Sequence, residues 1–397
     1  MVSVSEASAI IQSRPFAPGE ENVTLTKACG KVLGESIVAD RDLPPFDRVA
    51  MDGIAIQYAR FKNGDRLFPI EGIAAAGEPR HQLHNVTHCY EVMTGAPLPE
   101  NTDTVVRYED LIISQREATI MVDNLLPGQH VHPRGADAGK NAALLLPGTL
   151  ISPAEVSIIA STGKSTVRVK TLPHAAIIST GDELVDIDQQ PKAHQIRRSN
   201  SYAMYAALQS MGCEASLYHL PDQKEEINQR LSHILSLHDL LILSGGVSQG
   251  KFDFVPLSLE TLGVVKHFHK VKQKPGKPFW FGTMGNKTVF ALPGNPVSTY
   301  ICFYKYIRPW MWKSLGVQYP EDYAMLTQDF EFLPDLTYFL EAEVMNDRGQ
   351  LLAYPRVGGG SGDFANLKNS NGFLELPDGR DLFRKGEFFP VHRFRSI

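Results

Sequence analysis

The feature that most limits how this chain can fold is a short apolar run followed directly by a glycine-rich turn. Residues 240–243 are all leucine or isoleucine, which is typical of a strand that a parallel sheet buries on both faces. Residues 244–250 then contain three glycines and two serines. Open α/β folds bind ligands at the carboxyl edge of their sheet, where bare backbone N–H groups suit an anion. Ser244, Gly245 and Gly246 are therefore candidate ligand contacts.

A series of lysines follows this turn, although the net charge of the chain is −5. The lysines are Lys266, Lys270, Lys272, Lys274 and Lys277. On a strand, Lys270, Lys272 and Lys274 would share one face, which either binds an anion or protects a sheet edge. Lys274 and Lys277 stand in a Lys-Pro-Gly-Lys-Pro turn, which the prolines make rigid. The turn favours binding of phosphate or an anion of similar shape.

Residues 171–318 alternate between apolar strands and helical segments. We expect strands at 175–179, 214–219, 240–243 and 289–292. Between two of them, apolar residues recur at helical spacing and predict one buried helix face: Ile227, Leu231, Ile234 and Leu235. This alternation predicts βαβ units and an open, mostly parallel sheet that carries the site.

The rest of the chain predicts further domains of other classes. Residues 41–134 contain short alternating runs cut by Gly, Pro and Asn, which indicates a small β domain. It interrupts helix-like sequence at 1–40 and 135–170, so we expect a helical domain with an inserted β domain. Residues 319–397 are again β-like. The predicted fold class is thus multidomain α/β and β.

The overall composition excludes several classes of function. An acidic balance argues against nucleic acid as a partner. The four cysteines form no Cys-x-x-Cys pair, which favours a reduced compartment. The N-terminus lacks the pattern of a signal peptide, and no apolar run approaches the roughly 20 residues of a membrane span. We expect a cytoplasmic protein that does not bind membranes.

Acidic residues stand at the mouths of predicted loops. Glu183 and Asp222 each follow a predicted strand, and Asp253 follows the glycine turn. Three carboxylates at one sheet edge would suit Mg²⁺, which takes carboxylate and phosphate oxygens. Two of them have an alternative reading, because Asp222 and Asp253 can each cap a helix. Asp52 lies in a separate Asp-Gly turn.

Two other turns and one group of histidines have ordinary alternatives. Asn295, in Leu-Pro-Gly-Asn-Pro, places a helix start at the same sheet edge, and Thr94 lies in a similar Met-Thr-Gly-Ala-Pro turn. Both are plain turns unless other residues support them. His81, His84 and His88 lack ligand spacing and are expected to be surface histidines. The chain has no P-loop, no G-x-S-x-G and no G-x-G-x-x-G after a strand.

Several of these motifs occur together, in this order, in a known family. They are Pro44-Pro45-Phe46-Asp47, Ala50-Met51-Asp52-Gly53, Met93-Thr94-Gly95-Ala96-Pro97, Ser179-Thr180-Gly181-Asp182-Glu183-Leu184, Ser244-Gly245-Gly246-Val247-Ser248, Lys274-Pro275-Gly276-Lys277-Pro278, Leu292-Pro293-Gly294-Asn295-Pro296 and Gly360-Ser361-Gly362. With them the chain resembles the molybdopterin molybdenumtransferases, a family also represented by the C-terminal part of gephyrin. The resemblance spans nearly the whole chain.

The resemblance implies a homodimer whose cleft lies between the α/β domain of one subunit and the inserted β domain of the other. It implies the last step of molybdenum cofactor synthesis, in which molybdate is inserted into adenylylated molybdopterin with release of AMP. A divalent cation such as Mg²⁺ would assist, and the adenylyltransferase of the same pathway is a candidate partner. A related adenylyltransferase, or a pterin-binding scaffold without catalysis, are the alternative readings.

The resemblance also implies roles for individual residues. The catalytic residues would be Asp52, Glu183, Asp222 and Asp253, of which the last three would hold the metal. The substrate contacts would be Thr94, Gly95, Gly181, Ser244, Gly245, Gly246, Lys274, Lys277, Pro293, Asn295 and Ser361. Lys274 and Lys277 would hold molybdate or phosphate. One departure is Arg198, which stands where the family pattern leads us to expect an acidic residue and is the main hint of a scaffold.

Overall fold

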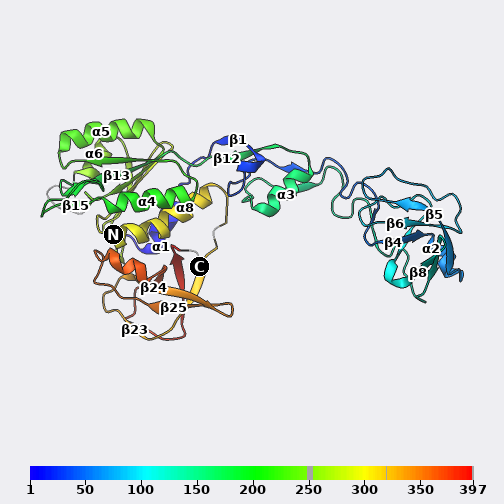
Figure 1. The fold of residues 1–397 in the computed structure, drawn as a ribbon. Coiled ribbons are helices and arrows are strands. Elements are labelled where there is room, and N and C mark those ends of the chain that lie inside the picture. Colours follow the sequence, from blue (N-terminus) through cyan, green and yellow to red (C-terminus); the bar gives the residue numbers. More distant parts are fainter. Residues whose placement is uncertain (248–253, 319, 396–397) are drawn as a thin grey trace.

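The structure is a computed structural model that describes residues 1–247, 254–318 and 320–395. The molecule is elongated (Figure 1): an open α/β sheet and a C-terminal β unit lie together at one end, and a separate β domain lies at the other. A narrow connector joins the two ends. Among the described residues, no helix combines the length and the apolar character needed to cross a membrane.

The α/β part is built on a six-stranded sheet of order β16-β13-β17-β21-β20-β18. Its strands are β13 (Ala175–Thr180), β16 (Ala215–Leu220), β17 (Leu240–Ser244), β18 (Val265–His269), β20 (Trp280–Met284) and β21 (Lys287–Leu292). The four predicted strands, β13, β16, β17 and β21, are present and parallel. β20 and β18 extend the sheet antiparallel. β13 and β17 are buried at every position, as expected for strands covered on both faces.

Helices cover the two faces of this sheet. One layer contains α4 (Ser199–Ser210), α7 (Pro296–Cys302), the π-helical turn η3 (Phe303–Ile307) and α8 (Arg308–Ser314). The other contains α5 (Lys224–Leu237) and α6 (Val255–Thr261). Successive residues of β17 alternate between the two cores: Leu240 and Ile242 pack against the first layer, and Leu241 and Leu243 against the second. The predicted face of α5 is confirmed, because all four of its apolar residues are buried.

The N-terminal helix α1 (Val4–Gln12) also packs onto this part, against α8. Its N-cap is Ser3, whose side chain accepts a hydrogen bond from the Glu6 N–H, while the Glu6 carboxylate accepts one from the Ser3 N–H. This reciprocal pair is a capping box. The buried residues of α1 therefore belong to the same hydrophobic core as the open sheet, although α1 lies in the region 1–40.

The C-terminal unit is a barrel-like β structure. Its strands are β22 (Asp322–Leu326), β24 (Thr337–Asp347), β25 (Gln350–Pro355), β26 (Gly372–Leu376) and β28 (Phe388–Arg393), with the small pair β23 (Phe330–Glu331) and β27 (Leu382–Phe383). The sheet closes because β24 pairs with both β25 and β26. A short strand from the α/β part, β19 (Gln273–Lys274), lies parallel to β24. The lysine turn is therefore fixed to both parts at once.

The distant β domain has a six-stranded sheet of order β7-β4-β6-β5-β9-β8. Its elements are β4 (Gly53–Ile56), α2 (Tyr58–Lys62), β5 (Leu67–Ala74), β6 (Cys89–Val92), β7 (Thr104–Arg107), β8 (Leu111–Ser114) and β9 (Glu117–Ile120). Two small cores lie on opposite faces of β4, since Ile54 and Ala55 belong to different clusters. The β-rich character predicted from the sequence is thus observed here.

The connector consists of two chain segments that run antiparallel to each other. Its strand pairs are β1 (Glu20–Thr24) with β12 (Thr166–Lys170), β2 (Ile37–Val38) with β11 (Ala143–Leu145), and β3 (Arg48–Val49) with β10 (Val131–His132). Helix α3 (Pro153–Ser161) packs beside the first pair. The regions 1–40 and 135–170, which we expected to be helical, thus contain β1, β2, β11 and β12 as well as α1 and α3.

Candidate active site

The carboxyl ends of four parallel strands form one edge of the open sheet. Thr180 is paired with Leu220, and Ser244 with Leu292, so β13, β16, β17 and β21 end level with one another. The loops after these strands therefore leave the sheet side by side. This is the edge at which open α/β folds bind ligands.

Two of the predicted acidic residues, Glu183 and Asp222, meet at this edge. Both line a cavity of about 330 Å³ together with Gly181, Gly245 and Gly246. The third, Asp253, lies outside the described residues. The structure therefore brings together two carboxylates and three of the predicted glycines in one cavity.

The interpretation of Asp222 as a helix cap is wrong. Helix α5 begins at Lys224, and its N-cap residue Gln223 makes no side-chain capping bond. The backbone N–H of Asp222 instead donates to Asp182 Oδ1 at 3.1 Å. This bond joins the loop after β16 to the loop after β13.

Carboxylates such as Glu183 and Asp222 are ligand types that a divalent cation such as Mg²⁺ accepts. Mg²⁺ usually binds one or two protein carboxylates and completes its shell with water and phosphate oxygens. Across residues 1–247, 254–318 and 320–395, no group of three or more His, Cys, Asp or Glu side chains forms a metal site by itself. Glu183 and Asp222 therefore do not form a complete metal site by themselves within the described part of the chain.

The turn after β17 requires glycine. Gly245 and Gly246 have φ angles of 98° and 66°, and a Cβ on either would lie 2.8 Å from an oxygen of Thr180. The Thr180 hydroxyl is itself buried and has no hydrogen-bond partner within the described ranges. A buried hydroxyl without a partner, next to a glycine turn, suits an oxygen of a bound ligand.

The lysine turn lines a second cavity, of about 300 Å³, between the open sheet and the barrel. Lys274 and Lys277 both line it, and neither has an ion-pair partner among the described residues. Lys272 is instead paired with Asp335 and Asp378 at 2.8 and 2.9 Å. The Lys274 ammonium group lies 5.5 Å from the centre of the Phe332 ring, which is a cation–π contact. Anion binding by the Lys-Pro-Gly-Lys-Pro turn stays a prediction, with which the lack of an ion pair at these two lysines agrees.

The idea that three alternating lysines share one strand face is wrong. β18 ends at His269, and Lys270 has a φ angle of 121°, so the chain turns before β19 begins at Gln273. The alternation in sequence therefore has no counterpart in a continuous strand.

The two cavities adjoin. Pro278, Pro293 and Asn295 line both of them. Asn295 Nδ2 donates to Ser361 Oγ at 2.7 Å, and the Val297 N–H donates to the Ser361 carbonyl oxygen at 3.1 Å. The loop after β21 thus separates a carboxylate-lined space from a lysine-lined space, and it is tied to the loop of the barrel that contains Ser361.

Sequence reasoning missed Asn200, in the first turn of α4. Its Nδ2 atom donates to Ser244 Oγ at 2.9 Å and to the Gly294 carbonyl oxygen at 2.7 Å. It therefore links the ends of β17 and β21. The spacing of Asn200 in the sequence gave no signal of these partners.

Arg198, the departure from the family pattern, binds an acidic residue close to it in the structure. Its side chain is mostly buried and forms an ion pair with Asp186. Asp186 also accepts a hydrogen bond from the Tyr202 hydroxyl at 2.8 Å. This bond, with the Ile187 N–H and the Arg198 charge, lowers the pKa of Asp186. The arginine thus braces the segment that follows Glu183, in which β14 (Leu184–Val185) pairs with β15 (Ile196–Arg197).

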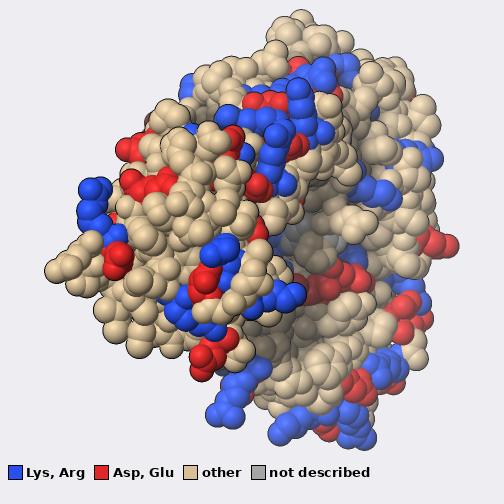
Figure 2. All heavy atoms as spheres, turned by 90° about the vertical axis from the view of Figure 1, so that its right-hand side faces the viewer, with Lys and Arg blue, Asp and Glu red and all other residues tan. Residues whose placement is uncertain are grey.

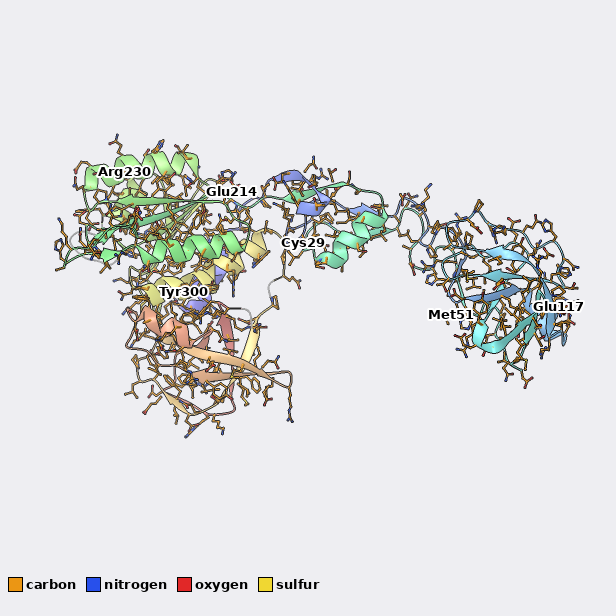
Figure 3. The ribbon with its side chains drawn as sticks, viewed as in Figure 1. Cys29, Met51, Glu117, Glu214, Arg230 and Tyr300 are labelled. Atoms are coloured by element: carbon orange, nitrogen blue, oxygen red, sulfur yellow. The ribbon has the colours of Figure 1, made fainter. Side chains whose placement is uncertain are left out.

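Asp52, Thr94 and Gly95 lie together in the distant β domain. Asp52 Oδ1 accepts hydrogen bonds from the Thr94 N–H at 2.6 Å and the Thr94 hydroxyl at 2.7 Å. These two bonds lower the pKa of Asp52. Figure 3 shows the adjacent Met51 in the β domain, far from Tyr300 of α7. Within one chain, this turn is therefore remote from the sheet edge.

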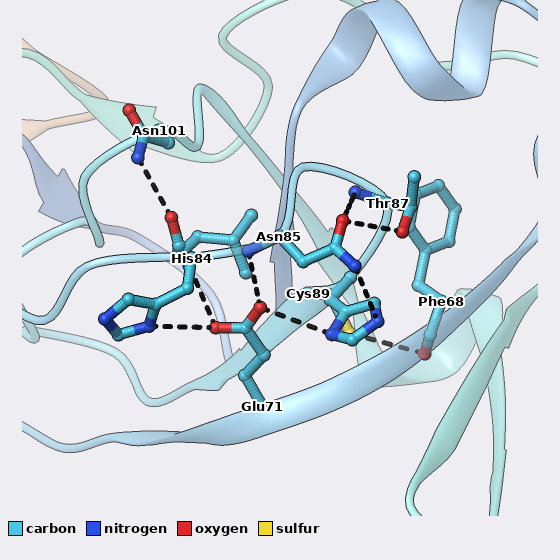
Figure 4. Close-up of polar contacts among 9 residues, drawn as sticks. Phe68, Glu71, His84, Asn85, Thr87, Cys89 and Asn101 are labelled. Carbon is cyan, nitrogen blue, oxygen red and sulfur yellow. Dashed lines mark hydrogen bonds and ion pairs between the residues drawn. The ribbon is translucent and has the colours of Figure 1, made fainter.

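The histidines of the β domain hold a loop in place. The Glu71 carboxylate accepts hydrogen bonds from the backbone N–H groups of His84 and Asn85 at 2.9 and 2.7 Å (Figure 4). It also lies 3.2 Å from His88 Nδ1. His81 is paired with Glu78 at 3.0 Å. Each of these histidines thus contacts a glutamate of the same domain, which gives it a structural role.

The face of the molecule at the β-domain end carries both signs of charge. Figure 2 shows acidic and basic side chains interspersed around a hollow in this face. The net charge of −5 is thus not separated into one acidic and one basic region on the face seen there.

Comparison with known families assigns this architecture. Residues 2–163 match the model of the MoeA N-terminal region (domains I and II), residues 176–313 that of a probable molybdopterin binding domain, and residues 323–394 that of the MoeA C-terminal region (domain IV). The chain therefore belongs to the MoeA family of molybdopterin molybdenumtransferases.

Individual relatives agree with this assignment. A molybdopterin molybdenumtransferase of Synechocystis is 42% identical over 99% of this chain and 100% of its own length. One from Haemophilus influenzae is 30% identical over 100% of both. A crystal structure of a molybdopterin biosynthesis MoeA protein from Pyrococcus horikoshii has a TM-score of 0.83 and 27% identity, with 100% of both chains covered.

Proposed function

We propose that this chain inserts molybdate into adenylylated molybdopterin and releases AMP. The observation that carries the proposal is the pair of adjoining cavities, one lined by carboxylates and a glycine turn and the other by two lysines without ion-pair partners. Both substrates are anions, and breaking the bond between two phosphates requires that the developing charge be neutralised. The relatives from Synechocystis and Haemophilus influenzae are named molybdopterin molybdenumtransferases, which supports the same reaction.

The two cavities bind different parts of the substrates. Lys274 and Lys277 hold molybdate, because two ammonium groups on a rigid turn suit a small tetrahedral dianion. Gly181, Ser244, Gly245 and Gly246 receive the phosphates of the nucleotide. Pro293, Asn295 and Ser361 form the wall between the two spaces and orient the pterin across it.

Glu183 and Asp222 hold a divalent cation, to which Asp253 is added on the sequence argument alone. When bound, Mg²⁺ supplies charge neutralisation at the phosphates. Replacing Asp253 by Asn tests this addition. We expect Asp253→Asn to lower molybdate-dependent AMP release at least ~10-fold with thermal stability changed by less than ~1 kcal/mol, and excess Mg²⁺ to restore part of the rate. Wild-type turnover at limiting Mg²⁺ would exclude a metal role.

The Asp52, Thr94 and Gly95 turn completes the site from a second subunit. Its distance from the sheet edge within one chain (Figure 3) supports a homodimer in which each cleft combines two chains. The adenylyltransferase that makes the substrate is the expected partner for delivery. The separate, unpaired cysteines, three of them buried, support a reduced, cytoplasmic setting.

Release of AMP from adenylylated molybdopterin, measured with and without molybdate, tests the proposal. We expect release that depends on molybdate and on a divalent cation. Formation of the adenylylated pterin from ATP would instead identify an adenylyltransferase. Binding of the pterin without turnover, under both conditions, would identify a scaffold.

A further inference from the structure

Glu341 is a buried carboxyl group in the lysine-lined cavity, and no role has been assigned to it. It lies on β24, is 8% exposed and lines the cavity together with Lys274 and Lys277. On the same strand, Leu340 and Ala342 belong to the barrel core, whereas Phe339 packs with the core of the open sheet. By strand alternation Glu341 shares the face of Phe339, so it is directed out of the barrel and toward the open sheet.

The structure also fixes Glu341 relative to the lysine turn. β19 pairs with β24 so that Lys274 is opposite Tyr338, three positions before Glu341. The Glu341 carboxyl has no ion-pair partner among the described residues. It accepts one hydrogen bond, from Asn366 Nδ2 at 2.6 Å. One carboxyl oxygen thus accepts the Asn366 hydrogen bond, and the other can contact a ligand in the cavity.

The surroundings of Glu341 raise its pKa above the ordinary value of a glutamate. Burial raises its pKa, the hydrogen bond from Asn366 opposes this increase, and the charge of Asp363 adds to it. Glu343 on the same strand is paired with Arg356. Lys274 and Lys277 line the same cavity from the turn, and the Lys274 ammonium group also lies over the Phe332 ring at 5.5 Å. No histidine is among the residues that line the cavity.

A neutral carboxyl group is a hydrogen-bond donor, and this decides which anions it accepts. Molybdate at neutral pH is a fully deprotonated dianion whose oxygens only accept hydrogen bonds. A protonated carboxyl can donate to it, whereas an ionised one would repel it. Phosphate differs, because near neutral pH it carries a proton of its own.

We infer that protonated Glu341 is a direct contact of molybdate in this cavity, so that molybdate binds together with a proton and binds less tightly as pH rises. This inference rests on the proposed function for the identity of the anion. It adds a selection rule, because the site then prefers tetrahedral dianions without a proton over phosphate.

Calorimetric titration of the full-length protein with sodium molybdate tests the inference. Titrations between pH 6 and 8.5, each in two buffers of different ionisation enthalpy, give the affinity and the number of protons taken up. Above the pKa of Glu341 in the free protein, we expect the affinity to fall about tenfold per pH unit, with up to one proton taken up per molybdate.

Two variants test whether the proton taken up with molybdate binds to Glu341. Glu341→Gln keeps the shape and a donor but cannot ionise, so its affinity should be independent of pH, with no proton uptake. Glu343→Gln, on the same strand and outside the cavity lining, is the matched control and should behave like the unmodified protein. Inorganic phosphate should bind with a weaker pH dependence than molybdate.

Three results would overturn the inference: no molybdate binding by the unmodified protein, binding without proton uptake, or an unchanged pH profile in Glu341→Gln. The proton uptake of the unmodified protein decides the question even if the variant does not fold. No AMP is measured here. If the proposed reaction is not observed, proton-coupled binding of molybdate would still support the role of Glu341. If the affinity for molybdate does not depend on pH, the role of Glu341 is excluded but the proposed reaction is not.

Discussion

At the scale of single residues, the lysines show how partners decide function. Lys266 lies 2.8 Å from Glu260 and Lys272 is paired with two aspartates, so their charges are already balanced. Lys274 and Lys277 line a cavity without such partners in the described chain. The sequence distinguished these two by their proline-rich turn. It could not show that the turn closes a space against the barrel.

Replacing Lys274 tests the role of this turn in binding molybdate. We expect Lys274→Ala to raise the molybdate concentration for half-maximal AMP release at least about tenfold, because a hydrogen bond to a charged group contributes about 1.5–3 kcal/mol. Binding of the pterin nucleotide should change little. Lys266→Ala removes a nearby cation outside both cavities and is the control. An equal loss of both affinities would mean that Lys274 holds phosphate.

Asn200 offers a test of the site's framework. Asn200→Ala removes the donor shared by Ser244 and Gly294, so we expect a loss of about 1–3 kcal/mol in the free energy of unfolding and slower AMP release. Urea unfolding and the activity assay measure the two effects. Asn22→Ala, at an exposed position of β1, should change neither. A stable but fully active Asn200→Ala enzyme would contradict this role.

At the scale of elements, periodicity predicted the open sheet well, and capping was predicted less well. The parallel strands are wholly apolar because both of their faces are covered, and α5 shows its buried face in its spacing. Capping depends on which of several neighbouring polar groups reaches an N–H, and for this reason Asp222, which the sequence offered as a cap, does not cap α5, whose N-cap residue is Gln223. Glu341 and Asn200 were missed because sequence spacing does not reveal which neighbouring domain a side chain faces.

The buried face of α5 allows a matched test. Leu231 is fully buried and Leu237, on the same helix, is 56% exposed. We expect Leu231→Ala to lower the free energy of unfolding by about 2–5 kcal/mol. Leu237→Ala should lower it by no more than about 0.5 kcal/mol. If both variants lower the free energy of unfolding equally in chemical denaturation, Leu231 does not pack in the core as the structure places it.

A buried group of charges fastens the barrel to the helices. Glu375 of β26 accepts hydrogen bonds from Lys305 of η3 and from His392 of β28, both at 2.7 Å. Burial alone would raise the pKa of Glu375, but the His392 bond and the Lys305 charge outweigh it and lower this pKa from 4.5 to about 2. The ionised form is therefore favoured in the folded protein.

This shift predicts a dependence of stability on acid. A carboxyl whose pKa is lowered by folding stabilises the protein above pH 4.5, and this contribution is lost as pH falls toward 2. We expect Glu375→Gln to be less stable than the unmodified protein at pH 7, and the difference to narrow between about pH 5 and pH 2. Glu387→Gln, in the same barrel, is the control. A constant difference across this range, in urea unfolding, would argue against the linkage.

At the scale of the whole molecule, the elongated shape separates residues that the proposed reaction needs together. The sequence placed Asp52 and Lys274 in different domains but could not give the distance between them, because this depends on the connector. A mixture of Asp52→Ala and Lys274→Ala proteins should regain part of the activity through heterodimers with one intact cleft. Subunit exchange followed by the AMP assay measures this recovery. An active monomer by light scattering would contradict a shared site.

The connector has a consequence for how such a protein can be altered by recombination. The chain enters the β domain at Arg48–Val49 and leaves it at Val131–His132, and these two short strands are paired with each other. A gene segment with these boundaries therefore encodes a unit whose two ends are already adjacent. We expect that replacing this segment by the matching one of a relative would change one wall of the proposed cleft. The strands, helices and lysine turn of the opposite wall would keep their own pairings.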